Sequence, residues 1–287
     1  MKCNVFVLLI VLVVMMGCKR EEVVVEKPFY PAVGAINARF SVGDTVTVVF
    51  AQGNLQYQAS TGSWRFATNQ YDVVGTSNEL IDTTYSGWID LFGWGTSGHG
   101  GRMPYMVVDS NLIYGFINAD IDGTNYDWGV VNPIDNGGSQ AGVWRTMTYE
   151  EWKYLFSFRN EAGVKRGLAR IEGLPQGVSM NGLVLLPDKW VLPDGCTFHY
   201  GVANGYETNR YSVEQWMWMQ GAGAVFLPAA GYRECYRVSL VSEYGCYWTA
   251  SYNDDETAYD LYIQSNGYAL STAAKSNGHS VRLVQNR

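Results

Sequence analysis

Oxygen-bearing side chains cluster in the middle of the chain, at a spacing that could hold a cation. Asn118, Asp120, Asp122 and Gly123 match positions 1, 3, 5 and 6 of a calcium loop, in which alternate oxygens converge on a hard cation. The position that should supply a bidentate Glu is Gly129, and no helix pattern leads into the loop. We therefore expect an Asp/Asn-rich turn stabilised by its own side chains, with a calcium site as the alternative.

Histidine and cysteine, the usual metal ligands and nucleophiles, are few and scattered. The histidines have no zinc-ligand spacing, and neither a G-x-S-x-G elbow nor a phosphate-binding loop occurs. Cys235 and Cys246 could pair across a hairpin-sized loop, but an odd count after the N-terminal segment leaves at least one free thiol. The sequence thus predicts no catalytic residue, no metal and no cofactor. The residues concerned are His99, His199, His279, Cys196, Cys235 and Cys246.

Tyrosines mixed with short polar residues mark the stretch best suited to binding. Tyrosine gives a large contact area at a small cost in conformational entropy, as in antibody paratopes. If Leu261 and Ile263 face inward, Asp260, Tyr262 and Gln264 face outward by alternation. The alternative is that these are ordinary exposed strand residues and that the acidic run containing Asp254 is a solvated loop tip. The predicted ligand-binding residues are Arg233, Tyr236, Tyr244, Tyr252, Asp254, Tyr259, Tyr262 and Tyr268.

The N-terminus has the pattern of a targeting segment. Lys2 supplies a positive charge, and the apolar stretch from Val5 to Met16 is too short for a membrane span of ~20 residues. Gly17-Cys18 follows, so the segment resembles a lipoprotein signal peptide with Cys18 as the lipidated residue. The acidic residues soon after it resemble the surface-export signal of Bacteroidota-type lipoproteins. We expect a signal peptide at 1–18 and a tether at 19–32; an ordinary secretory signal with a chance cysteine is the alternative.

Short apolar runs separated by Gly, Asn, Asp and Ser predict a series of β-strands. Two helices are expected, because Thr148 with Glu151 and Ser212 with Gln215 form capping boxes, and Trp152, Leu155 and Phe156 fall on one face of the first helix. Residues 86–140 are loop-like and rich in Trp and Gly. The predicted strands are 40–42, 45–51, 53–58, 64–67, 183–187, 225–227, 245–251, 258–264 and 280–284. The tryptophans expected in the core are Trp88, Trp94, Trp128, Trp144, Trp152, Trp190 and Trp248.

Several of these stretches resemble one family. FAQGNLQY at 50–57, FLPAAGYR at 226–233, GCYWTAS at 245–251 and the closing GHSVRLV look like the FISUMP-type major paralogous domain. WRTMTYEEW resembles the R-L-P-T-x-x-E-W signature of the formylglycine-generating-enzyme-like branch of the C-type lectin fold, with Met147 in place of the usual Pro. A similar run ends the variable proteins of diversity-generating retroelements. The resemblance implies a rigid scaffold that carries a variable, ligand-facing surface.

The resemblance does not carry enzymatic activity over to this chain. The oxidase relatives need a closely spaced C-terminal cysteine pair that binds copper as thiolates, which are soft ligands for a soft ion. Cys235 and Cys246 are eleven residues apart, and the motif that surrounds the pair in those enzymes is absent. We therefore expect a protein that is not an enzyme.

Composition and charge limit the remaining possibilities. Of the 287 residues 47% are hydrophobic and 16% charged, and 32 Gly with 20 Tyr indicate an ordered globule with many turns. A net charge of -7 argues against a nucleic-acid groove, which needs clustered Lys and Arg. We expect one α+β domain at 33–287 with a C-type lectin-like fold, built from short mixed or antiparallel strands, two main helices and long loops.

The predicted function is ligand binding at the cell surface. We expect an outer-membrane lipoprotein, held at the membrane through its lipid anchor only, that binds an extracellular glycan or protein without transforming it. The alternative is a structural or adhesive, fimbria-like protein that makes protein-protein contacts. The sequence leaves open which ligand is bound and whether the C-terminal face is diversified by a retroelement.

Overall fold

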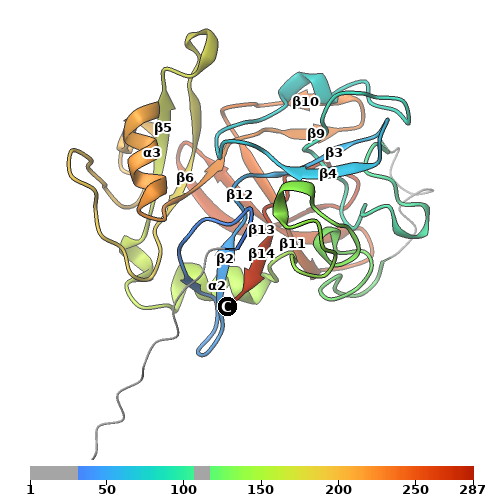
Figure 1. Ribbon diagram of the computed structural model, residues 1–287, viewed down its shortest axis with the longest axis horizontal. Coiled ribbons are helices and arrows are strands. Elements are labelled where there is room, and N and C mark those ends of the chain that lie inside the picture. The colour runs from blue at the N-terminus through green and yellow to red at the C-terminus, as the bar shows by residue number, and fades with distance from the viewer. Residues whose placement is uncertain (1–31, 107–116) are drawn as a thin grey trace, which may run out of the picture. The chain divides into compact units, whose positions relative to one another are not determined.

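The last strand of the chain pairs with the first ones. β14 (Val284–Asn286) lies antiparallel to β2 (Thr47–Phe50), which pairs on its other side with β1 (Phe40–Ser41). The computed structural model describes residues 32–106 and 117–287, and these described residues pack as one unit. β2 and β14 accordingly lie side by side in Figure 1.

The middle of the chain builds a four-stranded sheet with both faces buried. Its order is β7 (Arg210–Ser212), β5 (Arg166–Glu172), β6 (Met180–Leu185) and β8 (Val225–Pro228), and only the β5–β7 pair is parallel. Alternation sends Leu183 to one face and Val184 to the other. The helix α3 (Val213–Gly221) covers the Val184 face through Trp216 (Figure 1).

The C-terminal part forms an antiparallel sheet in the order β11-β12-β13. These strands are β11 (Gly245–Tyr252), β12 (Thr257–Gln264) and β13 (Gly267–Ala274). Two hairpins complete the strand set, β3 (Leu55–Gln58) with β4 (Ser63–Phe66) and β9 (Tyr232–Glu234) with β10 (Arg237–Ser239). The described chain is therefore α+β with mostly short antiparallel strands, as the sequence predicted.

The two main helices begin where the sequence predicted. In α2 (Tyr149–Ser157) and α3 the capping boxes of Thr148 with Glu151 and of Ser212 with Gln215 are both formed. A short third helix, α1 (Trp128–Val131), begins after Asp127, whose carboxylate accepts from the backbone N–H of Gly129. Short 3₁₀ segments span Gly75–Asn78, His99–Gly101, Asp135–Gly137, Ala162–Val164, Pro175–Gly177 and Gly205–Thr208.

The buried Arg282 joins segments that are far apart in the sequence. Its guanidinium donates to Oδ1 of Asn54 (3.0 Å) and to the carbonyls of Ala51 (3.1 Å) and Phe226 (2.8 Å). Burial lowers the pKa of Arg282 to about 10. The stretches FAQGN, FLP and VRLV therefore meet at the side chain of Arg282. These motifs hold the interior of the fold together at this point.

Some expectations need correction. The predicted strand at 280–284 is mostly extended chain with single bridges, and β14 begins only at Val284. The sequence did not predict the strands β5, β7, β9, β10 and β13. In β13 the sequence GYALSTAA has little β-branched character, and its ladder to β12 holds it as a strand. Trp88 and Trp190 are only half-buried, whereas the other five predicted core tryptophans are at most 1% exposed.

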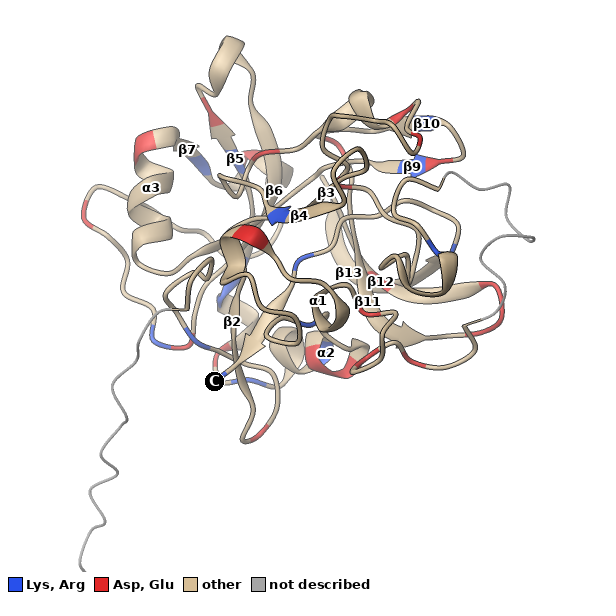
Figure 2. Cartoon of the chain, turned by 45° about the vertical axis from the view of Figure 1, so that its right-hand side comes forward, with Lys and Arg blue, Asp and Glu red and all other residues tan. Residues whose placement is uncertain are grey.

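Charged residues are spread thinly over the described elements. Figure 2 shows Lys and Arg scattered over strands and loops rather than gathered on one surface.

Cys196, Cys235 and Cys246 are all free thiols, so the pairing of Cys235 with Cys246 considered from the sequence does not occur. Cys246 is buried and Cys235 is exposed.

Candidate functional site

A pocket opens between the hairpin β9–β10 and the outer face of the β11-β12-β13 sheet. Its volume is about 320 Å³. Three tyrosines line it, Tyr232, Tyr244 and Tyr262, together with the polar residues Glu234, Ser271, Thr272 and Asn277. Cys246, Asp260 and His279 also line it, although each is at most 7% exposed, so these three form its floor.

Strand register explains why these side chains meet. Cys246 is paired with Tyr262 across β11 and β12, and Asp260 is paired with Ser271 across β12 and β13. Paired residues point to the same face, and so do residues two apart along a strand. Cys246, Asp260 and Tyr262 therefore share the face opposite to that of Leu261 and Ile263.

His279 reaches the floor from a separate segment. The chain at 279–280 runs beside β11, where Ser280 donates its N–H to the carbonyl of Cys246 (2.9 Å). The ring of Trp248 stacks on that of His279 with centroids 4.2 Å apart. Trp248 is itself held by its indole N–H, which donates to the carbonyl of Phe92 (2.6 Å). The imidazole is thus positioned by a fixed aromatic plane.

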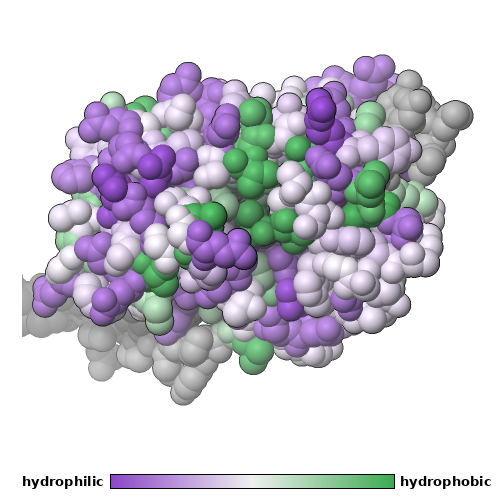
Figure 3. All heavy atoms as spheres, turned by 90° about the horizontal axis from the view of Figure 1, so that it is seen from above, coloured by the Kyte–Doolittle hydropathy of each residue, from purple (hydrophilic) through white to green (hydrophobic). Residues whose placement is uncertain are grey.

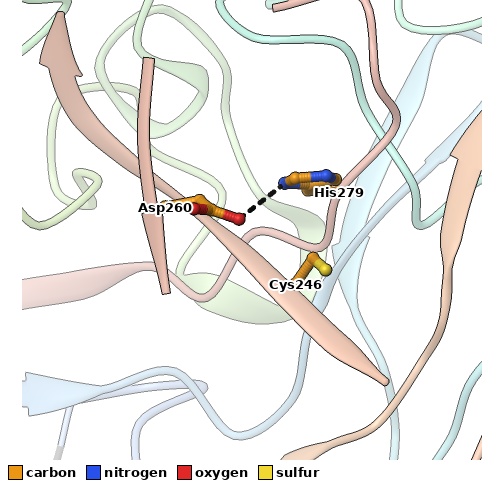
Figure 4. A group of neighbouring side chains, drawn as sticks. All are labelled: Cys246, Asp260 and His279. Atoms are coloured by element: carbon orange, nitrogen blue, oxygen red, sulfur yellow. Dashed lines mark ion pairs between the residues drawn. The ribbon is translucent and has the colours of Figure 1, made fainter. Parts of the chain in front are cut away.

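The floor residues form a compact group of possible metal ligands (Figure 4). Nδ1 of His279 lies 3.4 Å from Oδ2 of Asp260, and one donor atom from each of the three residues lies within 4.8 Å of the others. Figure 4 shows the carboxylate and the imidazole facing each other, with Cys246 beside them. Within the described ranges, Oδ1 of Asp260 and Nδ1 of His279 have no hydrogen-bond partner.

Burial favours the uncharged form of each floor residue. It raises the pKa of Asp260 to about 7 and lowers that of His279 to about 3. Burial, followed by the nearby Asp260 carboxylate, raises the pKa of the Cys246 thiol. Near neutral pH the floor therefore presents lone pairs of a thiol, an imidazole and a carboxyl group that gives up its proton with difficulty.

Of the predicted binding residues, two line this pocket. They are Tyr262 and Tyr244, whose hydroxyl donates to Oε1 of Gln264. Tyr236 lies at the tip of the β9–β10 hairpin and is 65% exposed. Arg233, by contrast, is only 2% exposed and donates to the carbonyl of Leu91 (3.0 Å). The expectation that Arg233 faces a ligand therefore needs correction.

Two other tyrosines lie on the opposite face of the sheet. The ring of Tyr259 packs 4.3 Å from that of Tyr149, and the ring of Tyr268 lies 5.9 Å from that of Phe156. The prediction of one shared tyrosine face is therefore wrong for this pair. Asp260 has the predicted orientation relative to Leu261, but it is 3% exposed because it lies on the pocket floor.

Tyr252 ends β11, and Asp254 lies in the loop that follows it before β12. The hydroxyl of Tyr252 donates to Asp255 (2.9 Å), and Nζ of Lys275 lies 4.5 Å above its ring. Oδ1 of Asp254 accepts from the N–H (2.7 Å) and the hydroxyl (2.8 Å) of Thr257, and these bonds hold its pKa below the usual value. Both side chains thus stabilise the loop tip, in line with the alternative considered from the sequence.

The acidic segment at 118–123 also serves the fold. Oδ1 of Asp120 accepts from the backbone N–H of Tyr252 (2.8 Å), which ties this segment to the end of β11. Thr124 donates its hydroxyl to the carbonyl of Ile121 (2.8 Å), a bond typical of a local turn. The carboxylate of Asp120 thus joins two distant segments, and the local turn bond comes from Thr124 instead of the expected Asp and Asn side chains.

Sequence reasoning missed several pocket residues. Tyr232 and Glu234 flank Arg233 in β9, and a strand sends alternate side chains to opposite sides, but three residues alone do not reveal which side is buried. His279 was set aside because no ligand spacing surrounds it. Cys246, Asp260 and His279 come together only through pairing between separate segments, for which the sequence carries no local signal.

A larger hollow, of about 590 Å³, lies beside the β5–β6 turn. Val73, Val74, Leu174 and Val178 supply much of its apolar lining. Figure 3 shows apolar residues gathered across the middle of the face seen from above. Two polar side chains that line this hollow make internal contacts: the guanidinium of Arg65 stacks 3.7 Å above the ring of Trp88, and the hydroxyl of Tyr85 donates to the carbonyl of Ser77 (2.9 Å). We therefore favour the tyrosine-lined pocket as the functional site.

Cys18 and the tether up to residue 31 lie outside the described residues. In the ranges 32–106 and 117–287, no helix has both the length and the apolar character that a membrane span requires. Searches against family models, curated proteins and solved structures found no match to this chain.

Proposed function

We propose that this protein is a surface-exposed lipoprotein whose C-type lectin-like domain binds a glycan or protein ligand without transforming it. The observation that carries the proposal is the pocket lined by Tyr232, Tyr244 and Tyr262. Tyr232 lies in β9, Tyr244 directly precedes β11, and Tyr262 lies in β12, so three separate segments supply one aromatic rim. Ligand sites commonly combine such apolar surfaces with a few placed polar groups.

The size and chemistry of the pocket favour a small part of a larger ligand. At about 320 Å³ it is at the lower end of the ~300–1,000 Å³ range of ligand pockets. Glu234 and Asn277 offer hydrogen-bonding groups beside the tyrosine rings. A sugar ring or a single side chain of a protein ligand suits this combination, because each has an apolar face and a polar edge.

The scaffold beneath the pocket supports pre-organised binding. β11 is anchored by the hydroxyl of Tyr247, which donates to the carbonyl of Pro228 (2.7 Å), and by the indole of Trp248. Binding to a surface that is already ordered costs less conformational entropy. This arrangement fits the rigid scaffold with a ligand-facing surface that the resemblance to C-type lectin-like proteins implies.

A screen of the full chain on glycan and extracellular-protein arrays tests the proposal. Tyr262→Ser and Tyr244→Ser should each weaken binding to the identified probe, and the stronger anchor should cost ~2 kcal/mol or more. Tyr200→Ser is the matched control, since Tyr200 is 62% exposed and lines a different pocket. Loss of affinity in the control but not in the two pocket variants would refute this site.

A second candidate function rests on the edge of the C-terminal sheet. In the described residues β13 pairs only with β12, and all eight residues of β13, Gly267–Ala274, are half-buried or exposed. A free edge strand can pair with a strand of another chain, which would suit an adhesive or polymerising protein. Concentration-dependent oligomers of the full chain that are lost in Ala274→Lys would favour this function over pocket binding.

A further inference from the structure

We propose that Cys246, Asp260 and His279 bind one zinc-class divalent cation on the pocket floor. This inference goes beyond ligand binding and does not depend on it. The three residues supply sulfur, oxygen and nitrogen, the donor types that zinc takes in proteins. No spacing rule predicts the site, because its residues come from two strands and a separate extended segment.

The distances suit a tetrahedral ion. Zn–N and Zn–O bonds of about 2.0–2.1 Å place neighbouring N and O ligands about 3.3 Å apart in a tetrahedron. Nδ1 of His279 and Oδ2 of Asp260 are 3.4 Å apart. Sulfur should lie about 3.6 Å from each of them. Since all three donor atoms lie within 4.8 Å of one another, a side-chain shift of about 1 Å closes the set.

Charge and hydrogen bonding favour a divalent ion of this class. A Cys246 thiolate and an Asp260 carboxylate carry two negative charges, which a divalent cation with a neutral imidazole balances inside a buried site. A sulfur ligand disfavours calcium and magnesium, which prefer oxygen. The ion would also satisfy the ring nitrogen of His279, which lacks a hydrogen-bond partner among the described residues.

Three protein ligands leave a fourth position on a tetrahedral ion. All three residues line the pocket, so that position faces the space beneath the tyrosine rim. Zinc sites with three protein ligands hold water or an exogenous donor there. The proposed ion would thus be reachable by a small donor molecule that enters the pocket.

The test uses the full chain, freed of metal with a chelator and kept in a phosphine reductant, and titrated with Zn²⁺ or Co²⁺. We expect one equivalent to bind, and the cobalt form to show a thiolate-to-metal charge-transfer band with the intense visible bands of tetrahedral cobalt. Added imidazole should shift these visible bands. If added imidazole did not change the visible cobalt bands, the proposal of an open fourth ligand position would be wrong. If the cobalt spectrum lacked the thiolate-to-metal band, the proposed metal site itself would be wrong.

Variants separate this site from adventitious binding. Cys246→Ser, Asp260→Asn and His279→Gln should each lower the zinc affinity at least about a hundredfold, since even changes to the partners of metal ligands cost 10–100-fold. Cys235→Ser, Cys196→Ser and His199→Gln are the controls and should leave the stoichiometry at one. If Cys235→Ser no longer bound one equivalent of zinc while Cys246→Ser still did, the zinc would be bound adventitiously at the exposed thiol of Cys235.

A folding defect in the variants would not obscure the result. Zinc should raise the melting temperature of the wild type, because the ion binds the folded state. It should not raise that of an Asp260→Asn protein that retains a cooperative transition. If all three floor variants failed to fold, the stoichiometry and cobalt spectrum of the wild type would still decide the question.

Discussion

Tyr262 and Tyr268 leave the β12–β13 hairpin on opposite faces of the sheet. Tyr268 is paired with Ile263, and its ring packs against the core beside Phe156 and α2. Tyr262 is paired with Ala269 and lines the pocket. Two tyrosines from the same hairpin thus have different surroundings, one in the packed scaffold and one in the pocket proposed to bind a ligand.

This separation predicts opposite phenotypes for two similar substitutions. Tyr262→Ser should leave stability within about ±0.5 kcal/mol and weaken binding. Tyr268→Ser should cost ~1–2 kcal/mol, because the ring loses its contact with Phe156 and with the guanidinium 5.4 Å away on Arg166, and should leave affinity unchanged. Thermal melts and binding to the array-identified probe measure both. Equal effects of the two variants on binding would contradict the assignment of faces.

Local patterns in the sequence predicted those features that depend only on neighbouring residues. The capping boxes at Thr148 and Ser212 were found because each joins residues three apart. The phase of β12 was also right, with Leu261 and Ile263 buried. Such features are decided within a few residues, so a single sequence contains the information that they require.

Features that depend on distant segments could not be predicted in this way. Arg233 is buried because its backbone pairs with Gly278 and its guanidinium donates to the carbonyl of Leu91. No local pattern in the sequence reveals these two contacts. Tyr259 was expected to face a ligand, but its partner Tyr149 comes from the start of α2. The pocket floor likewise depends on the approach of residues 279–280 to β11. Each of these wrong or missing predictions concerns which face of a strand is buried by a segment distant in the sequence.

The aromatic core provides the next prediction. Trp152 and Trp248 are each 1% exposed, so Trp152→Ala and Trp248→Ala should each cost ~3–5 kcal/mol through lost burial and the cavity left behind. Trp218→Ala is the matched control, since Trp218 is 45% exposed, and should cost less than ~1 kcal/mol. Denaturant unfolding of the full chain measures all three. Costs below ~1 kcal/mol for both buried positions would show that these tryptophans do not hold the core.

The proposed lipoprotein would be held at the membrane through Cys18, which precedes the described residues. If Cys18 is lipidated, radiolabelled palmitate should enter the wild-type protein, and Cys18→Ala should remove the label and release the protein from the membrane fraction. Cys235→Ser is the control, because this exposed thiol lies in the folded unit and should not affect labelling. A Cys18→Ala protein that still incorporates palmitate and still sediments with membranes would exclude the lipoprotein proposal.

A buried carboxyl group next to the β9 hairpin should make stability depend on pH. Oδ2 of Asp90 accepts from the backbone N–H of Val74 (2.7 Å), while Oδ1 has no hydrogen-bond partner among the described residues. Burial raises the pKa of Asp90 to about 7, against a lowering influence from these bonds and from Arg233. The native state therefore keeps a proton on Asp90 at pH values where the unfolded chain, with an ordinary pKa of 3.8, has lost it.

The sign of the effect follows from this difference in bound protons. Between about pH 4 and pH 7 the native state binds more protons at Asp90 than the unfolded state, so its contribution to stability is complete below pH 4 and is lost as the pH rises through about 7. The free energy of unfolding should fall over this window by at most ~1.4 kcal/mol per pH unit from this group. Asp90→Asn should match the wild type at about pH 4 and exceed its stability by a margin that grows up to about pH 7, because the amide remains neutral. Denaturant unfolding at pH 5, 6, 7 and 8 measures the two slopes. Parallel slopes would show that Asp90 ionises equally in the folded and unfolded chains.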